Sequence, residues 1–325
     1  MDGQGAAAQP RVAGFWRRVA AFAVDGVALG AIGWALAALL PESLAALGAW
    51  GRLLGFMIAG VYFLSCDGPW GGGRSPGKRL LGLRVADAAH GGPLTARRAA
   101  ARYAILGTPW FLDGAMLPPA LVTGEFTGAL LSLLVFGVGG AMAWLLVFDR
   151  ASRRSLHDRA TGAVVLRAAP SGVPTLPRLW RGHAVAVGAL LAASAVAPFA
   201  IKGALPGEQA QELLALERAL EALPGVRHVA LRDLGVARYG AAGASRERVV
   251  EVSVFIAGAP EEAAPQAEPV ADLALRIYPE AAQANEIAVT FLHGFDIGLA
   301  SGWRSRTFRY APEQWRDRIA GGAQG

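Results

Sequence analysis

Long apolar runs with few or no charges constrain the fold of this chain more than any other feature. The clearest run, 127–148, contains no charged side chain over 22 residues. A helix needs about 20 mostly apolar residues to cross the hydrocarbon core of a bilayer. In lipid, every backbone polar group must also be hydrogen-bonded within the protein. The sequence therefore predicts an integral membrane protein built from spanning helices.

Five segments have the apolar character of a membrane-spanning helix. They are 19–40, 49–66, 103–122, 127–148 and 184–201. The first contains Asp25 and is followed by Pro41, which cannot continue the hydrogen bonding of a helix. The third contains Asp113 and three prolines, so a kinked or re-entrant course is the alternative to a full crossing. We expect an α-helical membrane domain of about five transmembrane helices.

The charges of the connecting segments alternate along the chain. Three arginines lie between residues 11 and 18, and the segments 67–102 and 150–181 hold seven Lys or Arg residues each. The intervening segments, 41–52 and 123–126, hold one basic residue and none. Lys and Arg are retained on the cytoplasmic side of a membrane. This pattern predicts a multi-pass protein of the inner (plasma) membrane with a cytoplasmic N-terminal tail, 1–18, and an extracytoplasmic C-terminus.

The two halves of the chain differ in charge, although only 17% of all residues are charged. Residues 1–201 carry a net charge of +9, and residues 202–325 carry −3. Most of the excess base flanks apolar segments, where membrane topology explains it. The pI of about 10.1 therefore does not indicate nucleic-acid binding. The expected partner is the lipid bilayer.

The last 120 residues or so have a different pattern, with normal charge content and amphipathic spacing. Residues 168–204 are interpreted as a linker with the fifth helix, and 205–325 as a small soluble α+β domain that folds on its own. The expected helices are 207–223 and 269–282, and the expected strands are 226–236, 248–257, 286–293 and 304–310.

The first membrane segment carries two charges that need an explanation. Arg18 lies at its start, and Asp25 follows seven residues later, so both fall on one face of a helix. A carboxylate inside a membrane helix is costly unless it is paired, protonated or hydrated. Two interpretations stay open: a structural ion pair between Arg18 and Asp25, or an ion or proton site.

Two further motifs lie in the basic loops. Residues 71–85 begin Gly-Gly-Gly-Arg-Ser-Pro-Gly-Lys-Arg, which resembles a phosphate-binding loop but has Arg79 where Ser or Thr would be required. Residues 153–165 contain His157 and Asp158, which supply too few ligands for a metal site. Asp158 could fold back to contact cytoplasmic arginines, including Arg18.

These three stretches, in this order and spacing, resemble the RDD family of small bacterial membrane proteins over residues 12–167. The family is named for one arginine and two aspartates, which correspond here to Arg18, Asp25 and Asp158. The resemblance implies an RDD-like transmembrane domain over 19–167. It also lends support to transport of ions or small solutes, which has been proposed for the family. The resemblance does not extend to residues 205–325, for which no family is recognised.

Two functions are compatible with these features. Asp25 and Asp113 within apolar segments favour a transporter of ions or small solutes. The separate C-terminal domain favours a membrane-anchored scaffold or assembly factor that binds another envelope protein or a second copy of itself. No nucleophile–base pair stands out, and His228, His293 and Asp296 are scattered, so we expect neither an enzyme nor a cofactor or metal.

The alternation of loop charge leads to a topological prediction. A reporter that is active only in the cytoplasm should be silent when fused after Gly325 and active when fused after Arg167, because the two positions are expected on opposite sides of the membrane. Reporter activity in cells expressing each fusion measures this. An active fusion at Gly325 would contradict the five-crossing topology.

Overall fold

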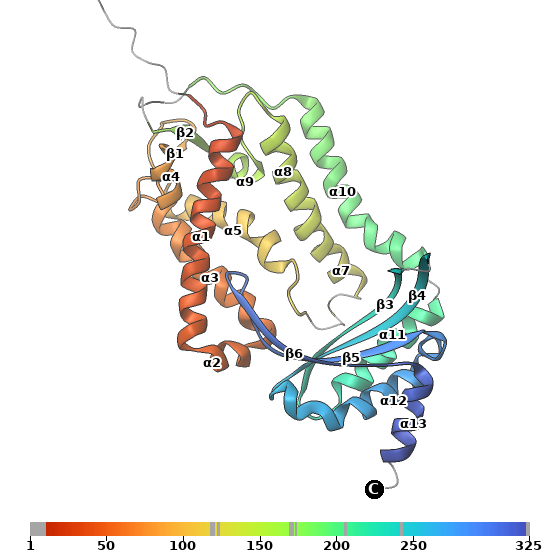
Figure 1. The fold of residues 1–325 in the computed structure, drawn as a ribbon. Coiled ribbons are helices and arrows are strands. Elements are labelled where there is room, and N and C mark those ends of the chain that lie inside the picture. The colour runs from red at the N-terminus through yellow and green to blue at the C-terminus, as the bar shows by residue number, and fades with distance from the viewer. Residues whose placement is uncertain are drawn as a thin grey trace, which may run out of the picture.

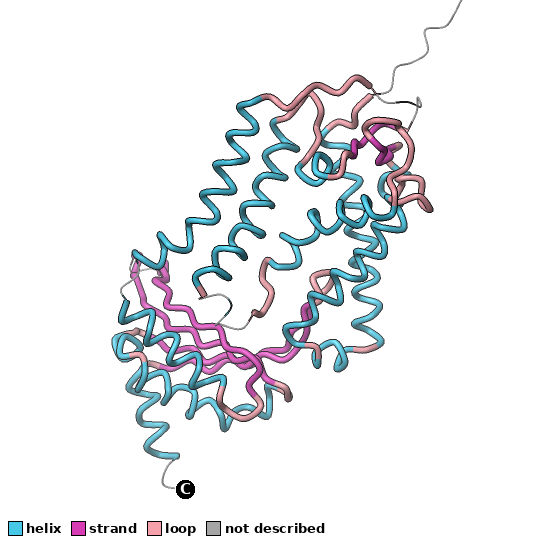
Figure 2. Tube along the Cα trace, turned by 180° about the vertical axis from the view of Figure 1, so that it is seen from behind, coloured by secondary structure: helices cyan, strands magenta, loops and turns pink. Residues whose placement is uncertain are grey.

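The computed structural model describes residues 11–117, 121, 124–168, 172, 174–204, 207–240 and 243–322. A bundle of long helices occupies one part of the molecule, and a curved sheet with its own helices occupies the other (Figure 1). The same two parts are seen from behind in Figure 2, where the strands cross beneath the ends of the long helices. The predicted combination of a helical membrane domain and a C-terminal α+β domain is confirmed.

Among the residues that the structure describes, four helical segments are long and apolar enough to cross a membrane. Their bounds agree with the segments expected from the sequence to within a few residues, because length and apolarity are local properties. The first is α1 (Phe15–Leu39), and the second consists of η1 (Gly48–Trp50) and α3 (Gly51–Asp67). The third consists of α7 (Glu125–Ser132), the π-helix η2 (Leu133–Gly137) and α8 (Val138–Phe148). The fourth is α10 (Arg181–Ala204).

The helix expected over 103–122 has different bounds. α5 spans Ala96–Leu112, and Asp113 caps its C-terminus as an exposed residue rather than lying inside the helix. Thr95 caps the N-terminus by accepting a hydrogen bond from the backbone N–H of Arg98. Gly114 ends the helix with a positive φ of 69°. Residues 118–120 and 122–123 of the expected segment lie outside the described residues.

Short elements gather at one end of the long helices, which we call the motif end. The strands β1, Leu83–Asp87, and β2, Ala163–Arg167, pair antiparallel there. The short helices α4, Pro76–Leu80, and α9, Leu156–Ala160, pack beside them. These elements contain the last two motifs noted in the sequence. The motif end therefore brings together stretches that are about 80 residues apart in the chain.

The other end of the helices faces the C-terminal sheet, and we call it the sheet end. The short helix α2, Pro41–Ala46, joins α1 to α3 there. Successive long helices run in opposite directions between the two ends, and α5 also joins the motif end to the sheet end although it has only 17 residues (Figure 1). β2 and the C-terminal domain consequently lie at opposite ends of the bundle.

The C-terminal domain contains a four-stranded sheet in the order β3-β4-β5-β6. β4 and β5 are parallel and the other neighbours are antiparallel. The parallel pair requires a crossover, which η3, α12 and η4 provide. The strands are β3 (Val226–Gly240), β4 (Gly243–Ile256), β5 (Glu286–Asp296) and β6 (Ser301–Tyr310). The crossover elements are η3 (Pro260–Gln266), α12 (Ala267–Ile277) and η4 (Pro279–Gln283).

Three helices cover one face of this sheet. α11, Gly207–Glu221, and α12 pack on the alternate apolar residues of the strands, and α13, Pro312–Gly322, adds the fully buried Trp315. α13 was not expected from the sequence, since few of its residues are apolar. The opposite face of the sheet is turned toward the sheet end of the membrane helices (Figure 1).

The turn between β5 and β6 is inserted into the sheet end of the membrane helices. Ile297, at its tip, is completely buried and packs with residues of α1, α2 and α3. Glycines make room for the turn: a Cβ at Gly55 would lie 1.7 Å from the carbonyl oxygen of Ile297, and a Cβ at Gly51 would lie 2.6 Å from that of Asp296. The two parts of the molecule are therefore packed together and not merely tethered.

Polar contacts hold the same turn in place. Arg52 forms an ion pair with Asp296 at 2.7 Å, and the indole N–H of Trp110 donates to the carbonyl oxygen of Gly298 at 3.0 Å. The segment 293–299 is thus the end of β5 and a docked turn. Asp296, expected from the sequence to be one of several scattered polar residues, has a specific partner in Arg52 of α3.

Docking of the turn can be tested by a cross-link. The Cβ positions of residues 33 and 300 lie about 3.0 Å apart, close to the separation of about 3.8 Å found in disulfides. Gly33→Cys with Ala300→Cys, in a Cys66→Ser background, should therefore form an intramolecular disulfide on mild oxidation. Proteolysis between the domains followed by non-reducing electrophoresis measures it.

The control pair is Gly26→Cys with Ala300→Cys, because the Cβ of residue 26 has no neighbour within 4 Å. This pair should remain unlinked under the same conditions. Equal cross-linking of both pairs, or of neither, would show that the turn does not occupy the groove beside Gly33.

Candidate functional site

Seven ionisable side chains meet in the interior of the motif end, and we call them the charge cluster. They come from five different elements, two of them long helices and two of them short helices at the motif end, with α5 as the fifth. They are Arg18 and Asp25 of α1, Asp67 of α3, Lys78 of α4, Arg102 of α5, and His157 and Asp158 of α9.

Asp158 lies at the centre of the charge cluster and is completely buried. Its carboxylate accepts hydrogen bonds from Arg18 Nη2 at 2.6 Å and from Arg102 Nε at 2.9 Å. Burial alone would raise the pKa of Asp158, but the adjacent His157 and the two guanidinium groups outweigh that effect and hold the pKa well below its usual range. Asp158 is therefore a fixed negative charge.

Arg102 joins Asp158 to a second carboxylate. Its Nη1 donates to Asp67 at 2.7 Å, and Lys78 Nζ donates to the other oxygen of Asp67, also at 2.7 Å. Asp67 and Arg102 are 1% and 5% exposed. Because one guanidinium bridges two carboxylates, the ends of α3 and α5 and the short helices α4 and α9 are held in one arrangement.

His157 lies beside these groups and is neutral. Burial lowers its pKa, and the neighbouring Arg102 acts in the same direction, although Asp158 opposes both. Its Nε2 faces Arg102 Nη2 at 3.2 Å.

Asp25 differs from the other two acids in its partners. Its carboxylate is 1% exposed and accepts hydrogen bonds from Tyr62 Oη at 2.8 Å, from the backbone N–H of Gly77 at 2.8 Å and from the Ser75 hydroxyl. All three donors are neutral. Among the described residues Asp25 forms no ion pair, whereas Asp67 and Asp158 each bind two cationic side chains.

The start of α4 is pressed directly against α1. A Cβ at Gly77 would lie 2.1 Å from the carbonyl oxygen of Ala21, so glycine is required for this approach. Ser75 caps α4 by accepting from the backbone N–H of Lys78 and also donates to Asp25. The Ser-Pro-Gly-Lys stretch is therefore a cap over the Asp25 carboxylate and not a phosphate-binding loop.

The structure changes the pairing expected for Arg18. Arg18 forms an ion pair with Asp158 and not with Asp25. Contact between Asp158 and cytoplasmic arginines was one of the expectations from the sequence. Seven residues of helix rise by about 10 Å, so two side chains on one face are still two turns apart. A partner on α9 lies closer. Asp113, the other acid expected within a membrane helix, is exposed at the sheet end and takes no part in the charge cluster.

Three members of the charge cluster and its partner Tyr62 were not expected from the sequence to take part in a site. Asp67 ends an apolar run, and Lys78 and Arg102 lie in a basic loop where membrane topology alone explained them. Tyr62 is a single hydroxyl in an apolar helix. The spacing of the Ser-Pro-Gly-Lys motif was a signal for Lys78, but no local pattern shows that Arg102 is buried.

These features define a multi-pass membrane protein whose helices are joined at one end by a buried charge cluster. Residues 12–162 match the sequence model of the RDD family. The chain thus carries an RDD family membrane domain, and the C-terminal region lies outside the match. Comparisons with curated proteins and with solved structures give no match.

The pairing within the charge cluster can be tested by double-mutant cycles. Arg18→Ala and Asp158→Asn should each destabilise the detergent-solubilised protein by about 3–5 kcal/mol, the usual cost of leaving a buried charge unpaired. The double variant should lose much less than the two losses together, because the residues are direct partners. Chemical unfolding of the purified protein gives these free energies.

The matched cycle pairs Arg18→Ala with Asp25→Asn. It should show a clearly smaller coupling energy, because no hydrogen bond or ion pair joins these two described residues. A larger coupling in this cycle than in the Arg18–Asp158 cycle would restore the pairing expected from the sequence and contradict the structure.

Proposed function

We propose that this protein transports protons or small cations across the plasma membrane and that Asp25 binds the transported species. The main support is the environment of Asp25. It is buried in α1, accepts hydrogen bonds from three neutral donors and forms no ion pair with any described residue. A carboxylate in a membrane helix without a counter-charge is stabilised by taking up a proton or a cation. Asp67 and Asp158, which have cationic partners, are structural.

The contacts of Asp25 suggest how binding is linked to movement. The charged carboxylate accepts from Ser75 and Gly77, which lie at the start of α4. A proton on Oδ1 of Asp25 competes with the backbone N–H of Gly77, which can only donate, whereas the Ser75 hydroxyl can reverse its role and accept. Protonation therefore weakens the attachment of α4 to α1, and α4 acts as a gate over Asp25 at the motif end.

The opposite end of the same helices is closed by the β5–β6 turn. Ile297 is buried between α1 and α3, and its neighbours are fixed by the Arg52–Asp296 ion pair. In this proposal the turn blocks the sheet end while α4 covers the motif end. The basic motif end faces the cytoplasm and the C-terminal domain lies outside, as the distribution of loop charges favours.

The alternative function is a scaffold or assembly factor that binds another envelope protein. The observation in its favour is β6, which is an edge of the sheet and carries the exposed arginines Arg304, Arg306 and Arg309. Unpaired backbone groups on an edge strand can accept a strand from a partner. In this alternative the charge cluster only stabilises the membrane domain.

Flux measurements in proteoliposomes test the transport proposal. The purified full-length protein should dissipate an imposed gradient of H⁺, Na⁺ or K⁺, followed with an internal pH dye or an ion-selective dye. Asp25→Asn should reduce flux to the level of protein-free liposomes while the folded protein remains, and Asp25→Glu should retain part of it.

The matched control is Asp67→Asn, which removes a buried acid of the same charge cluster that has two cationic partners. It should lower the yield of folded protein but not the flux per folded molecule. Wild-type flux equal to that of protein-free liposomes for all three ions would overturn the transport proposal. Equal loss in both variants would overturn the role of Asp25.

A further inference from the structure

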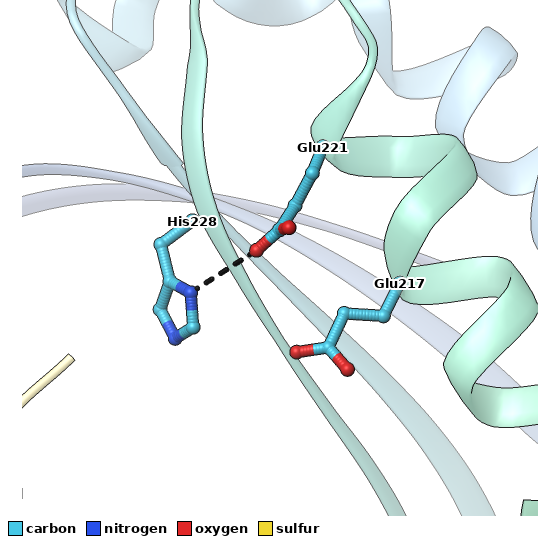
Figure 3. A group of neighbouring side chains, drawn as sticks. All are labelled: Glu217, Glu221 and His228. Carbon is cyan, nitrogen blue, oxygen red and sulfur yellow. Dashed lines mark hydrogen bonds and ion pairs between the residues drawn. The ribbon is translucent and has the colours of Figure 1, made fainter. Parts of the chain in front are cut away.

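A second group of ionisable side chains lies in the C-terminal domain, far from the charge cluster in the sequence. Glu217 and Glu221 of α11 and His228 of β3 bring one potential ligand atom each to within 4.8 Å of one another. Figure 3 shows the two carboxylates extending from successive turns of α11 toward the imidazole on the strand. His228 Nδ1 lies 3.3 Å from a carboxylate oxygen of Glu221.

The local fold places these three side chains together. Leu216 and Leu220 are completely buried against the sheet, so the residues that follow them, Glu217 and Glu221, lie along the edge of the helix next to β3. Residues four apart on a helix are neighbours on one face. The pairing of β3 with β4 is irregular just before His228, whose ring packs against Phe255 at 5.7 Å between centroids.

The two carboxylates are not balanced by nearby cations. Glu217 forms no hydrogen bond or ion pair with another described residue, and Glu221 contacts only His228 among them. Two half-buried acids that repel each other beside an imidazole favour the binding of a divalent cation.

We propose that Glu217, Glu221 and His228 form a binding site for a divalent transition metal ion, with Zn²⁺ as the best fit. Zn²⁺ accepts imidazole nitrogen at about 2.0–2.1 Å and carboxylate oxygen at about 2.0–2.2 Å. The three ligand atoms already lie within 4.8 Å of one another, a separation that one ion between them can bridge after side-chain adjustment. Mg²⁺ and Ca²⁺ prefer sites made of oxygen alone, so the imidazole disfavours them.

The site has room for a further ligand. Glu221 and His228 line a cavity of about 210 Å³, which is also lined by Phe255 and Trp303. Three protein ligands and an open position are typical of zinc sites that bind a water or a small molecule, whereas purely structural sites have four protein ligands. The expected additional ligand is therefore a water molecule or a small anion held in this cavity.

The cavity lies where the C-terminal domain meets the membrane domain. Its other walls include Ala45, Gly48 and Met116 from the sheet end of the helices, and Arg227 donates a hydrogen bond to the carbonyl oxygen of Ala45. A metal ion bound here would cross-link α11 to β3 directly beside this contact. The inference is independent of the transport proposal, because it involves neither Asp25 nor α4.

Metal binding by the full-length protein tests the proposal. The detergent-purified protein, freed of its affinity tag and treated with a chelator, is titrated with Zn²⁺, and bound metal is counted by mass spectrometry after gel filtration. Visible absorption of the Co²⁺-loaded protein reports whether nitrogen and oxygen ligands surround the ion. We expect one Zn²⁺ per chain and a rise in the unfolding temperature on binding.

Substitutions identify the ligands. Glu221→Gln and His228→Gln should each abolish stoichiometric Zn²⁺ binding, while two controls should keep it: Glu208→Gln on the exposed first turn of α11, and His90→Gln, whose side chain is 86% exposed. Glu217→Gln removes no hydrogen bond between described residues. It should therefore leave the metal-free protein at least as stable as the wild type and still weaken Zn²⁺ binding.

The outcomes distinguish the site from incidental binding. Wild-type protein that binds no Zn²⁺ would overturn the proposal. So would stoichiometric binding that survives both Glu221→Gln and His228→Gln, or binding that is lost equally in the two control variants. Loss in the Glu217, Glu221 and His228 variants alone would support it.

Discussion

The bridge that Arg102 makes between Asp67 and Asp158 is the interaction on which the rest of the membrane domain depends. Charges inside a protein that spans a membrane are stable only when partners satisfy them, and removal of one partner leaves an unpaired buried charge. Arg18 and Lys78 complete the pairing. Because these residues come from five different elements, the position of each short helix at the motif end is determined by the need to pair every charge.

A different constraint operates at the sheet end of the same helices. There the contact is made by backbone and apolar side chains, and glycines on α1 and α3 allow the β5–β6 turn to approach closely. Small residues at such contacts are a common means of close packing in membrane helices. The helices that carry the charge cluster are thus restrained at both ends, by ion pairs at one end and by an inserted turn at the other. Asp25, whose donors are neutral, lies at the motif end beside the start of α4.

The sequence predicted the apolar helices, the four β-strands of the C-terminal domain and the charged motif residues, but not the strands β1 and β2 of the motif end. It placed the third membrane segment incorrectly because hydropathy does not recognise a helix whose first half contains Arg97, Arg98 and Arg102. These basic residues predict a loop, but Arg98 and Arg102 lie in the helix and donate hydrogen bonds to other parts of the membrane domain. The capping residue Thr95 was the one local signal for the true start of α5. In the C-terminal domain, α13 was missed because it has only two large apolar residues, Trp315, which is fully buried, and Ile319, which is partly buried against the same core.

What the sequence determined by itself is everything that depends on neighbouring residues: the length and apolarity of the membrane helices, the alternation of strands, the charges of the loops and the presence of the RDD motifs. What only the tertiary structure decided is which residues are partners. Arg18 meets Asp158 from 140 positions away and not Asp25 on its own helix, and Glu217 and Glu221 meet His228 only because α11 lies along β3. The physical reason is that periodicity reports the face of an element on which a side chain lies. Its partner depends on how the elements pack, and packing is a property of the whole chain.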